Sequence, residues 1–152
     1  MVDDIDRQVV NALLRDGRAS ARDVAAETGV AATTVSRRMD ELVASGVIEG
    51  YTPQVDYGSL GYEVTAVFHL SVEGTGLQPV TDRLRDTPNM IAVYEVTGSH
   101  DVVAIGKFRD TASLNAAIKD LLTDDEIRSA STSVVLNAVR EYEQFPVEES
   151  GG

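Results

Sequence analysis

The chain has 152 residues, with 13 basic residues against 25 acidic ones and a formal net charge of −12 at pH 7. It contains no cysteine, no apolar run of about 18 residues and no signal-peptide pattern, which argues against thiolate metal sites, membrane spans and secretion. No phosphate-binding loop, nucleophile elbow or zinc-protease motif is present. We therefore expect a cytoplasmic protein with no cofactor, no metal and no catalytic site.

The first predicted element is a helix over residues 3–17. Acidic residues occupy its opening turn and Gly17 ends it, which suits the helix dipole and the usual stop signal. Ile5, Val9 and Leu13 recur at helical spacing and predict a buried seam.

Residues 20–42 have the pattern of a helix-turn-helix motif, with two short helices separated at Gly29. Ser20 and Asp23 are spaced as a capping box, which predicts the start of the first of these helices. A glycine ends a helix well because it adopts the left-handed conformation without steric cost, so Gly29 predicts the turn.

The second helix of the motif predicts a DNA-reading surface. Val35, Met39 and Leu42 form one apolar stripe, which leaves hydroxyl and guanidinium side chains on or near the free face. Such side chains contact bases and phosphates in DNA complexes. The alternative is a helical hairpin that only packs. The expected DNA contacts are Arg22, Thr33, Thr34, Ser36, Arg37 and Arg38.

A domain boundary follows this motif. Gly46 stops the last helix, so residues 1–50 form a three-helix, winged type of DNA-binding domain. Proline and glycine then punctuate residues 51–62, which predicts a hinge containing a short strand at 51–55.

The second domain, residues 63–145, alternates strand and helix patterns. Their order is strand, helix, strand, strand, helix, strand, which predicts a ferredoxin-like βαββαβ sheet and an α+β fold overall. The tail at 146–152 is predicted to be disordered. The predicted elements are 63–72, 77–85, 90–97, 101–108, 112–122 and 127–142.

Five pieces of the sequence carry a family resemblance through their order and spacing. They are residues 4–7, 14–18, the motif around Gly29, 46–51 and 98–101. Together they resemble the Lrp/AsnC family, the feast/famine regulators of bacteria and archaea, over residues 3–142. The resemblance implies an amino-acid-responsive transcriptional regulator that dimerises through its sheet and assembles further, for example into an octamer.

The same resemblance implies an effector site at the turn between the second and third strands. Gly98 permits close backbone approach, and Asp101 could accept hydrogen bonds from an ammonium group. A plain tight hairpin is the alternative. Two departures stand out: His100 replaces a frequent aromatic residue, and Ala31 replaces the usual cap of the recognition helix. The implied effector contacts are Thr97, Gly98, Ser99, His100 and Asp101.

A two-fold dimer also agrees with simple geometry. A ferredoxin-like sheet leaves one face uncovered by helices, and a partner's sheet is a natural cover. A two-fold axis places two recognition helices about 34 Å apart, which matches one turn of DNA at a palindromic site.

Acidic residues concentrate in the second domain, while residues 15–38 hold five arginines against three acidic residues. The acid excess and the presence of only two lysines, Lys107 and Lys119, resemble a haloarchaeal protein. At molar salt the screening length falls to about 3 Å, so repulsion between the chain and DNA nearly vanishes. Specificity should then depend on base contacts and DNA shape.

Two other functions stay open. Siroheme decarboxylases resemble the same two-domain architecture, but their His-Asn-Tyr stretch is replaced by Ala-Val-Tyr-Glu-Val at 92–96. A sensor that pairs with other regulators without binding DNA is the other alternative. The only histidines, His69 and His100, could bind a metal with Asp101, but 31 residues separate them. A packed or surface role is the commoner fate of a histidine such as His69.

Overall fold

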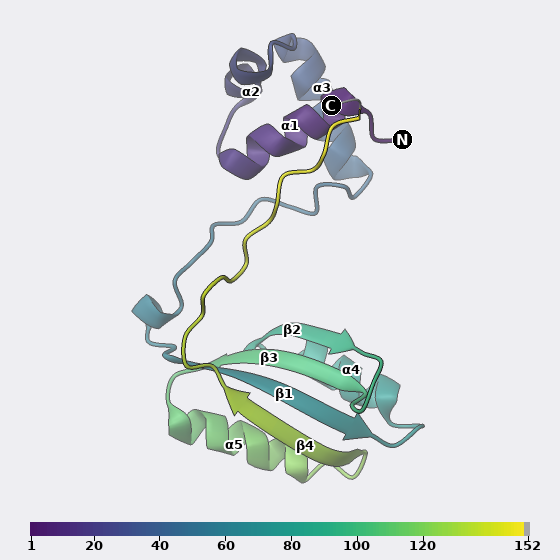
Figure 1. The fold of residues 1–152 in the computed structure, drawn as a ribbon, viewed down its shortest axis with the longest axis vertical. Helices are drawn as coiled ribbons and strands as arrows, with labels where there is room; N and C mark the ends of the chain where they lie inside the picture. The colour runs from purple at the N-terminus through teal and green to yellow at the C-terminus, as the bar shows by residue number, and fades with distance from the viewer. Residues whose placement is uncertain (151–152) are drawn as a thin grey trace. The chain divides into compact units, whose positions relative to one another are not determined.

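The computed structural model describes residues 1–150 and contains two compact units (Figure 1). The helical unit comprises Met1–Gln54 together with the C-terminal segment from Arg140, and the sheet unit comprises Val55–Val139. No helix in the described part of the chain is long and apolar enough to cross a membrane.

The helical unit contains three helices, α1 (Asp4–Arg15), α2 (Ala21–Thr28) and α3 (Ala32–Ala44). Their apolar stripes meet in one core, as the helical spacing predicted. Gly29 lies between α2 and α3 with φ 75°, the left-handed conformation expected of it. The fully or nearly fully buried core residues are Val9, Ala12, Leu13, Val24, Val35 and Leu42.

The three helices begin differently. In α2 the predicted capping box is confirmed: the Ser20 hydroxyl accepts from the Asp23 amide (3.2 Å) and the Asp23 carboxylate accepts from the Ser20 amide (2.9 Å). Asp3 and Asp6 form the same box at α1, which the sequence reasoning missed. Helix α3 begins at Ala31 with no side-chain cap. Its first turn therefore lacks the contribution of about 1 kcal/mol that a serine or aspartate supplies.

No strand forms at residues 51–55, so that prediction is wrong. A strand needs a hydrogen-bonded neighbour, and Pro53 cannot donate from its nitrogen. The chain instead runs without regular structure to a single 3-10 turn, Gly58–Leu60, before the sheet begins.

The sheet unit confirms the predicted ferredoxin-like topology. Its four antiparallel strands are arranged in the order β2-β3-β1-β4, with β1 and β3 at the centre. The elements, in chain order, are β1 (Val64–Val72), α4 (Leu77–Arg85), β2 (Met90–Glu95), β3 (Val102–Phe108), α5 (Thr111–Leu122) and β4 (Ile127–Val134).

Strand β1 shows how the two faces of this sheet differ. Phe68 and its alternate neighbours are buried in one core with residues of α4 and α5, such as Val80 and Leu114. Successive side chains of a strand point to opposite faces. Val67 and His69 therefore point to the face without helices, where both are only partly buried. His69 lies beside Val103 of β3 and Ser131 of β4 on that face.

The C-terminal end of the chain differs from its prediction. Strand β4 ends at Val134 rather than at 142, because residues beyond the edge of β1 have no strand to pair with. The tail is also held as far as Ser150. The buried Asn11 side chain accepts from the amide of Val147 (2.8 Å) and donates to its carbonyl (2.9 Å). The rest of the predicted disordered tail, 151–152, lies outside the described residues.

Candidate nucleic-acid interface and effector hollow

Helix α3 presents the predicted DNA-reading face. Val35 and Leu42 are buried on its inner side, so the predicted stripe is confirmed. Thr33, Ser36 and Arg37 are exposed on the other side. The result is a helix surface of hydroxyl and guanidinium groups that can hydrogen-bond with base edges and phosphates.

The flanking members of the predicted set lie at the margin of this face. Thr34 is partly buried on α3, and Arg22 lies exposed on α2. Arg22 makes no ion pair with another residue in the part of the chain that the structure describes, 1–150. By contrast, Arg15 pairs with Glu27 across α1 and α2. Of these two arginines, Arg22 is therefore the one whose charge is not offset by a carboxylate of the same unit.

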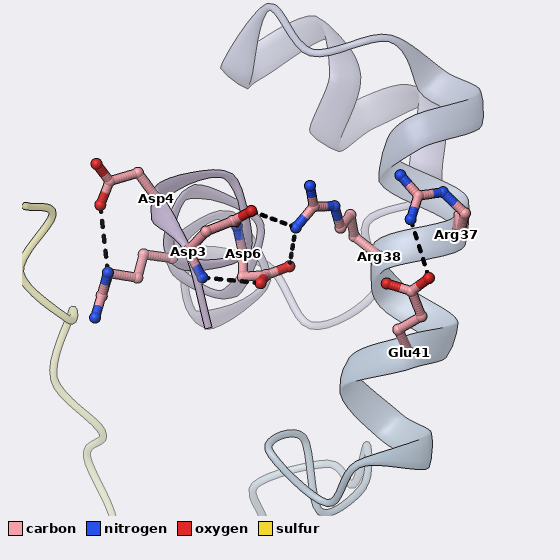
Figure 2. Close-up of polar contacts among 7 residues, drawn as sticks. Asp3, Asp4, Asp6, Arg37, Arg38 and Glu41 are labelled. Carbon is pink, nitrogen blue, oxygen red and sulfur yellow. Dashed lines mark hydrogen bonds and ion pairs between the residues drawn. The ribbon is translucent and has the colours of Figure 1, made fainter. Parts of the chain in front are cut away.

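Arg37 is free to change partner. Its side chain is 58% exposed and contacts Glu41 one turn along the same helix at 3.0 Å (Figure 2). An exposed pair of this kind contributes only about 0.3–0.5 kcal/mol, so a DNA phosphate or guanine can replace Glu41 at little cost.

Arg38 is placed differently, although it is the next residue. Its Nη1 donates to Asp3 Oδ2 (2.6 Å) and Asp6 Oδ1 (3.2 Å), and its side chain is only 19% exposed (Figure 2). The pKa of Asp3 is lowered first by the backbone amide of Asp6 and then by Arg38, whose own pKa is raised by these carboxylates. Arg38 therefore joins α3 to the start of α1.

The position of Arg38 in the sequence could have indicated that it makes a contact within the unit. It lies three residues after Val35 and four before Leu42, so it borders the buried stripe on the helix surface. Arg37 is rotated about 100° away from it. The structure thus brings the predicted DNA residues onto one motif but commits Arg38 to a contact within the unit.

The sheet unit contains an open hollow of about 660 Å³ on the face that the helices leave uncovered. Four of the five expected effector residues line it, and the strands supply the rest. The lining contains no carboxylate, lysine or arginine, and its only ionisable side chains are the two histidines. The lining residues are His69, Val96, Thr97, Gly98, Ser99, His100, Val103, Ser131 and Ser133.

Gly98 gives the turn at this hollow its shape. Its φ of 110° lies in the region that side chains other than glycine rarely adopt, and the space where a Cβ would be is open. The amide of Val96 donates to the carbonyl of Asp101 (2.9 Å) and closes the turn. The backbone therefore reaches the hollow without a side chain at its tip.

Asp101 is the expected effector residue that does not line the hollow. Its Oδ2 accepts from the amide of Val72 (2.8 Å), and its own amide donates to the carbonyl of Leu70 (2.8 Å). These bonds lie just beyond the last pair of β1 and β3, Leu70 with Val102. The Val72 amide faces the same edge of β1 as the Leu70 carbonyl, where no β3 residue is paired with it, so the Asp101 carboxylate serves as its acceptor.

The fold places the side chains of His69 and His100 next to one another. The ring centroids of His69 and His100 are 5.3 Å apart, with the ring planes tilted by 53°. A hydrogen bond joins Ser99 Oγ and His100 Nδ1 at 3.3 Å. Their separation in sequence concealed this pairing, which depends on the β1–β3 register and on the turn that follows β2.

Two family models match the chain in succession. One, described as a winged helix-turn-helix DNA-binding domain, matches residues 2–49, and the other, the Lrp/AsnC ligand binding domain, matches residues 65–145. The matches correspond to the two sites described above.

Similar proteins of known name span nearly the whole chain. An uncharacterized HTH-type transcriptional regulator of Pyrococcus abyssi, PYRAB04820, is 33% identical over 141 residues, which is 93% of this chain and 96% of that protein. The HTH-type transcriptional regulator FL11 of Pyrococcus furiosus is 29% identical and covers 97% of each chain.

Solved structures support the same fold. The structure of Escherichia coli AsnC has a TM-score of 0.81 at 24% identity and covers 99% of this chain and 97% of that one. The complex of the Neisseria meningitidis regulator NMB0573 with L-Met has a TM-score of 0.87 at 19% identity, covering 93% and 94%. With a matched ligand-binding domain over more than half its length and a relative above 30% identity, the chain belongs to the Lrp/AsnC family of helix-turn-helix transcriptional regulators.

Proposed function

We propose that the protein binds specific DNA sites through α3 and regulates transcription in response to a small effector. The observation that carries this proposal is the exposed face of Thr33, Ser36 and Arg37 on a helix whose inner stripe is buried. Arg22 and Thr34 extend this surface, and Arg38 holds α3 in place beneath it. Specificity then arises from α3 contacts to base edges in the major groove.

The effector proposed for the hollow is an amino acid, and the regulated genes would serve amino-acid or nitrogen metabolism. The family match over residues 65–145 and the L-Met complexes of two structural neighbours support an amino acid. The backbone at Gly98 and the hydroxyls of Ser99, Ser131 and Ser133 supply hydrogen-bonding groups for its carboxylate. Thr97 and His100 complete the expected contacts.

The active form proposed is a homodimer, with further assembly to an octamer as one possibility for this family. The uncovered sheet face supports this, because it carries Val67, Val103 and Ile105 partly buried and Tyr94 56% exposed. Apolar groups in a row on one face gain free energy when a second copy covers them. A two-fold pair would then read a palindromic site.

The proposed setting is the cytoplasm of a halophilic archaeon. The net charge of −12 supports it, since an acidic surface repels DNA strongly at low salt and hardly at all when molar salt shortens the screening length to about 3 Å. The curated relatives come from other archaea, Pyrococcus and Methanocaldococcus, so the salt habitat depends on composition alone.

No catalytic role is proposed. Relatives along the whole chain are named transcriptional regulators, and the β2 segment that corresponds to the siroheme decarboxylase motif ends in Tyr94 and Glu95 without a histidine. Turnover of a tetrapyrrole by the purified protein would contradict this view.

The experiment that tests DNA recognition is selection from sheared genomic DNA of the host, at low and at molar salt, with sequencing of the retained fragments. The wild-type protein should retain a small set of fragments that share a palindrome, and Arg37→Ala should lose them. Arg85→Ala is the matched control, because Arg85 is an exposed helical arginine paired with Asp82 in the sheet unit. A wild-type protein that retains no fragment above background in either salt would overturn the proposal.

A further inference from the structure

We propose that His69 and His100 bind one divalent transition-metal ion in the hollow of the sheet unit. They are the only histidines of the chain, and they approach one another on the sheet face that the helices leave uncovered. The proposal rests on the placement of these two rings and on the chemistry of the residues around them.

The separation of the rings suits a shared ion. Imidazole nitrogens bind Zn²⁺ at about 2.0–2.1 Å, and two of them on one tetrahedral ion place their ring centroids roughly 5 Å apart. The observed centroid separation is 5.3 Å, with a tilt of 53° that rules out flat stacking.

Ser99 prepares His100 for this role. Its hydroxyl lies 3.3 Å from Nδ1 of His100, so Nε2 is the nitrogen left for a ligand. When Nδ1 donates its proton to the hydroxyl, Nε2 presents a lone pair. Metal-binding histidines commonly have their other nitrogen held by an oxygen in this way.

The lining selects the class of ion. The residues around the two rings are neutral, and the nearby carboxylate of Asp101 is held by the amide of Val72. Mg²⁺ and Ca²⁺ prefer carboxylate and carbonyl oxygens, whereas imidazoles suit Zn²⁺, Cu²⁺, Ni²⁺ and Co²⁺. The hollow is therefore built for the second group.

The pair fills only part of a coordination shell. Residues 1–150 contain no cluster of three or more histidine, cysteine or carboxylate ligands. Two positions of a tetrahedral ion are thus left for water or for a small molecule in the hollow.

If the proposed function holds, those open positions explain how the hollow receives an amino acid. No carboxylate lines the hollow to pair with an ammonium group. An α-amino acid can instead lose one proton from its ammonium group to solvent and bind the ion through its amine nitrogen and one carboxylate oxygen, replacing two waters. Metal binding of this kind releases protons, as ligand deprotonation requires.

The test uses the full chain without an affinity tag, stripped of metal and labelled with ¹⁵N. Only two histidines give imidazole signals, so a Zn²⁺ titration followed by NMR reports on both sites directly. We expect the signals of His69 and His100 to shift along one common binding curve, and Mg²⁺ to leave them unmoved. Independent curves for the two rings, or no shift, would overturn the proposal.

Variants add a second readout by calorimetry with Zn²⁺. His69→Gln and His100→Gln should each lower the Zn²⁺ affinity about 10-fold or more, in line with the loss of a ligand or of its support. Ser129→Ala is the matched control, since Ser129 is an exposed serine of the same strand β4 that does not line the hollow, and it should bind as the wild type does. Equal Zn²⁺ affinity in all three variants would contradict a two-histidine site.

A last arm separates this inference from the proposed function. Amino acids are titrated into the protein with and without Zn²⁺. Tighter binding with Zn²⁺ supports chelation, and equal binding without metal overturns chelation while the effector proposal stands. If no amino acid binds in either state, the effector proposal fails, and the Zn²⁺ titration alone decides the metal site.

Discussion

The two candidate sites of this protein are built in opposite ways. The DNA-reading face is a continuous stretch of one helix, and its side chains Ser36 and Arg37 are exposed and need no distant partner to be in place. The hollow is assembled from β1, β4 and the turn after β2, and its two histidines are 31 residues apart in sequence.

This difference predicts how each site responds to mutation. Single changes on the exposed face of α3 should alter DNA affinity without altering folding. Changes at the hollow act on the sheet and on a turn that requires the positive φ of Gly98, so binding and stability should change together. Measurements of stability, of its pH dependence and of binding affinity separate these two behaviours.

The largest effect is expected from Phe68→Ala. Phe68 is fully buried between the sheet and its helices and lies edge-on to Phe108, with ring centroids 6.0 Å apart. Its removal should cost the sheet unit about 3–5 kcal/mol, because the cavity cannot fully collapse. Hydrogen exchange should show lost protection in β1 and β3 and unchanged protection in α1–α3. Val24→Ala, in the separate core of the helical unit, should give the reverse pattern.

Gly98→Ala should be the next in size. At φ 110° an alanine strains the turn by about 1–3 kcal/mol, although its Cβ meets no neighbour. Thermal unfolding should show a lower melting temperature. Effector binding at the hollow should also be weaker. Gly74→Ala serves as control, since its Cβ also meets open space and it has no positive φ. Equal melting temperatures for the two variants would show that the turn conformation is not a constraint.

Substitutions at the helix caps should change stability by a smaller amount. Removing the cap of α2 should lower stability, and adding a cap to α3 should raise it. Ser20→Ala removes a cap of α2 and should destabilise the helical unit by about 1 kcal/mol. Ala31→Ser should stabilise it by a similar amount, because Ala31 already has the extended ψ of 137° from which a serine can reach the Thr34 amide. Denaturant unfolding measures both, and a neutral Ala31→Ser would mean that α3 has another source of support.

The smallest effect is the dependence of stability on pH. The pKa values of Asp3, Asp4 and Asp23 are lowered chiefly by backbone amides, those of Asp6, Ser150 and Ser20 respectively. A lowered folded pKa means that this stability is present above the ordinary aspartate value of 3.8 and is lost as pH falls through the lower folded values. The free energy of unfolding, measured from pH 6 downwards, should at first stay constant and then decline. Asp23→Asn should make the decline of the unfolding free energy with pH less steep. An unchanged slope would exclude a contribution from the carboxylate of Asp23 in its capping box.

The sequence predicted the parts of the fold that depend on local spacing. The Ser20–Asp23 box, the buried stripe on α3 and the order of the six elements in the sheet unit follow from periodicity and turn residues within short windows. The same reasoning placed a strand at 51–55, where the local composition is suitable but no neighbouring strand exists to pair with it.

The parts that it could not predict depend on partners far along the chain. Arg38 is held by Asp3, which lies 35 residues before it, and Asn11 is held by Val147, 136 residues after it. The Asp101 carboxylate accepts from the Val72 amide because β1 extends past its last pair with β3, Leu70 with Val102, and this strand end depends on the long-range register. Arg38 and Asp101 thus make structural contacts where free binding side chains were expected, and Asn11 holds a tail that was expected to be disordered.

Arg37 and Arg38 are neighbours in α3, but only Arg37 is proposed to contact DNA, while Arg38 contacts Asp3 and Asp6. Fluorescence anisotropy of a labelled duplex carrying the selected palindrome, titrated with wild type, Arg37→Ala and Arg85→Ala at fixed salt, tests this assignment. We predict that Arg37→Ala weakens binding at least about 10-fold, the value of one good base contact, with an unchanged melting temperature. Arg85→Ala should match the wild type. If Arg37→Ala binds the palindrome as tightly as the wild type and Arg85→Ala do, α3 does not read DNA through this face and the proposed DNA contact is wrong.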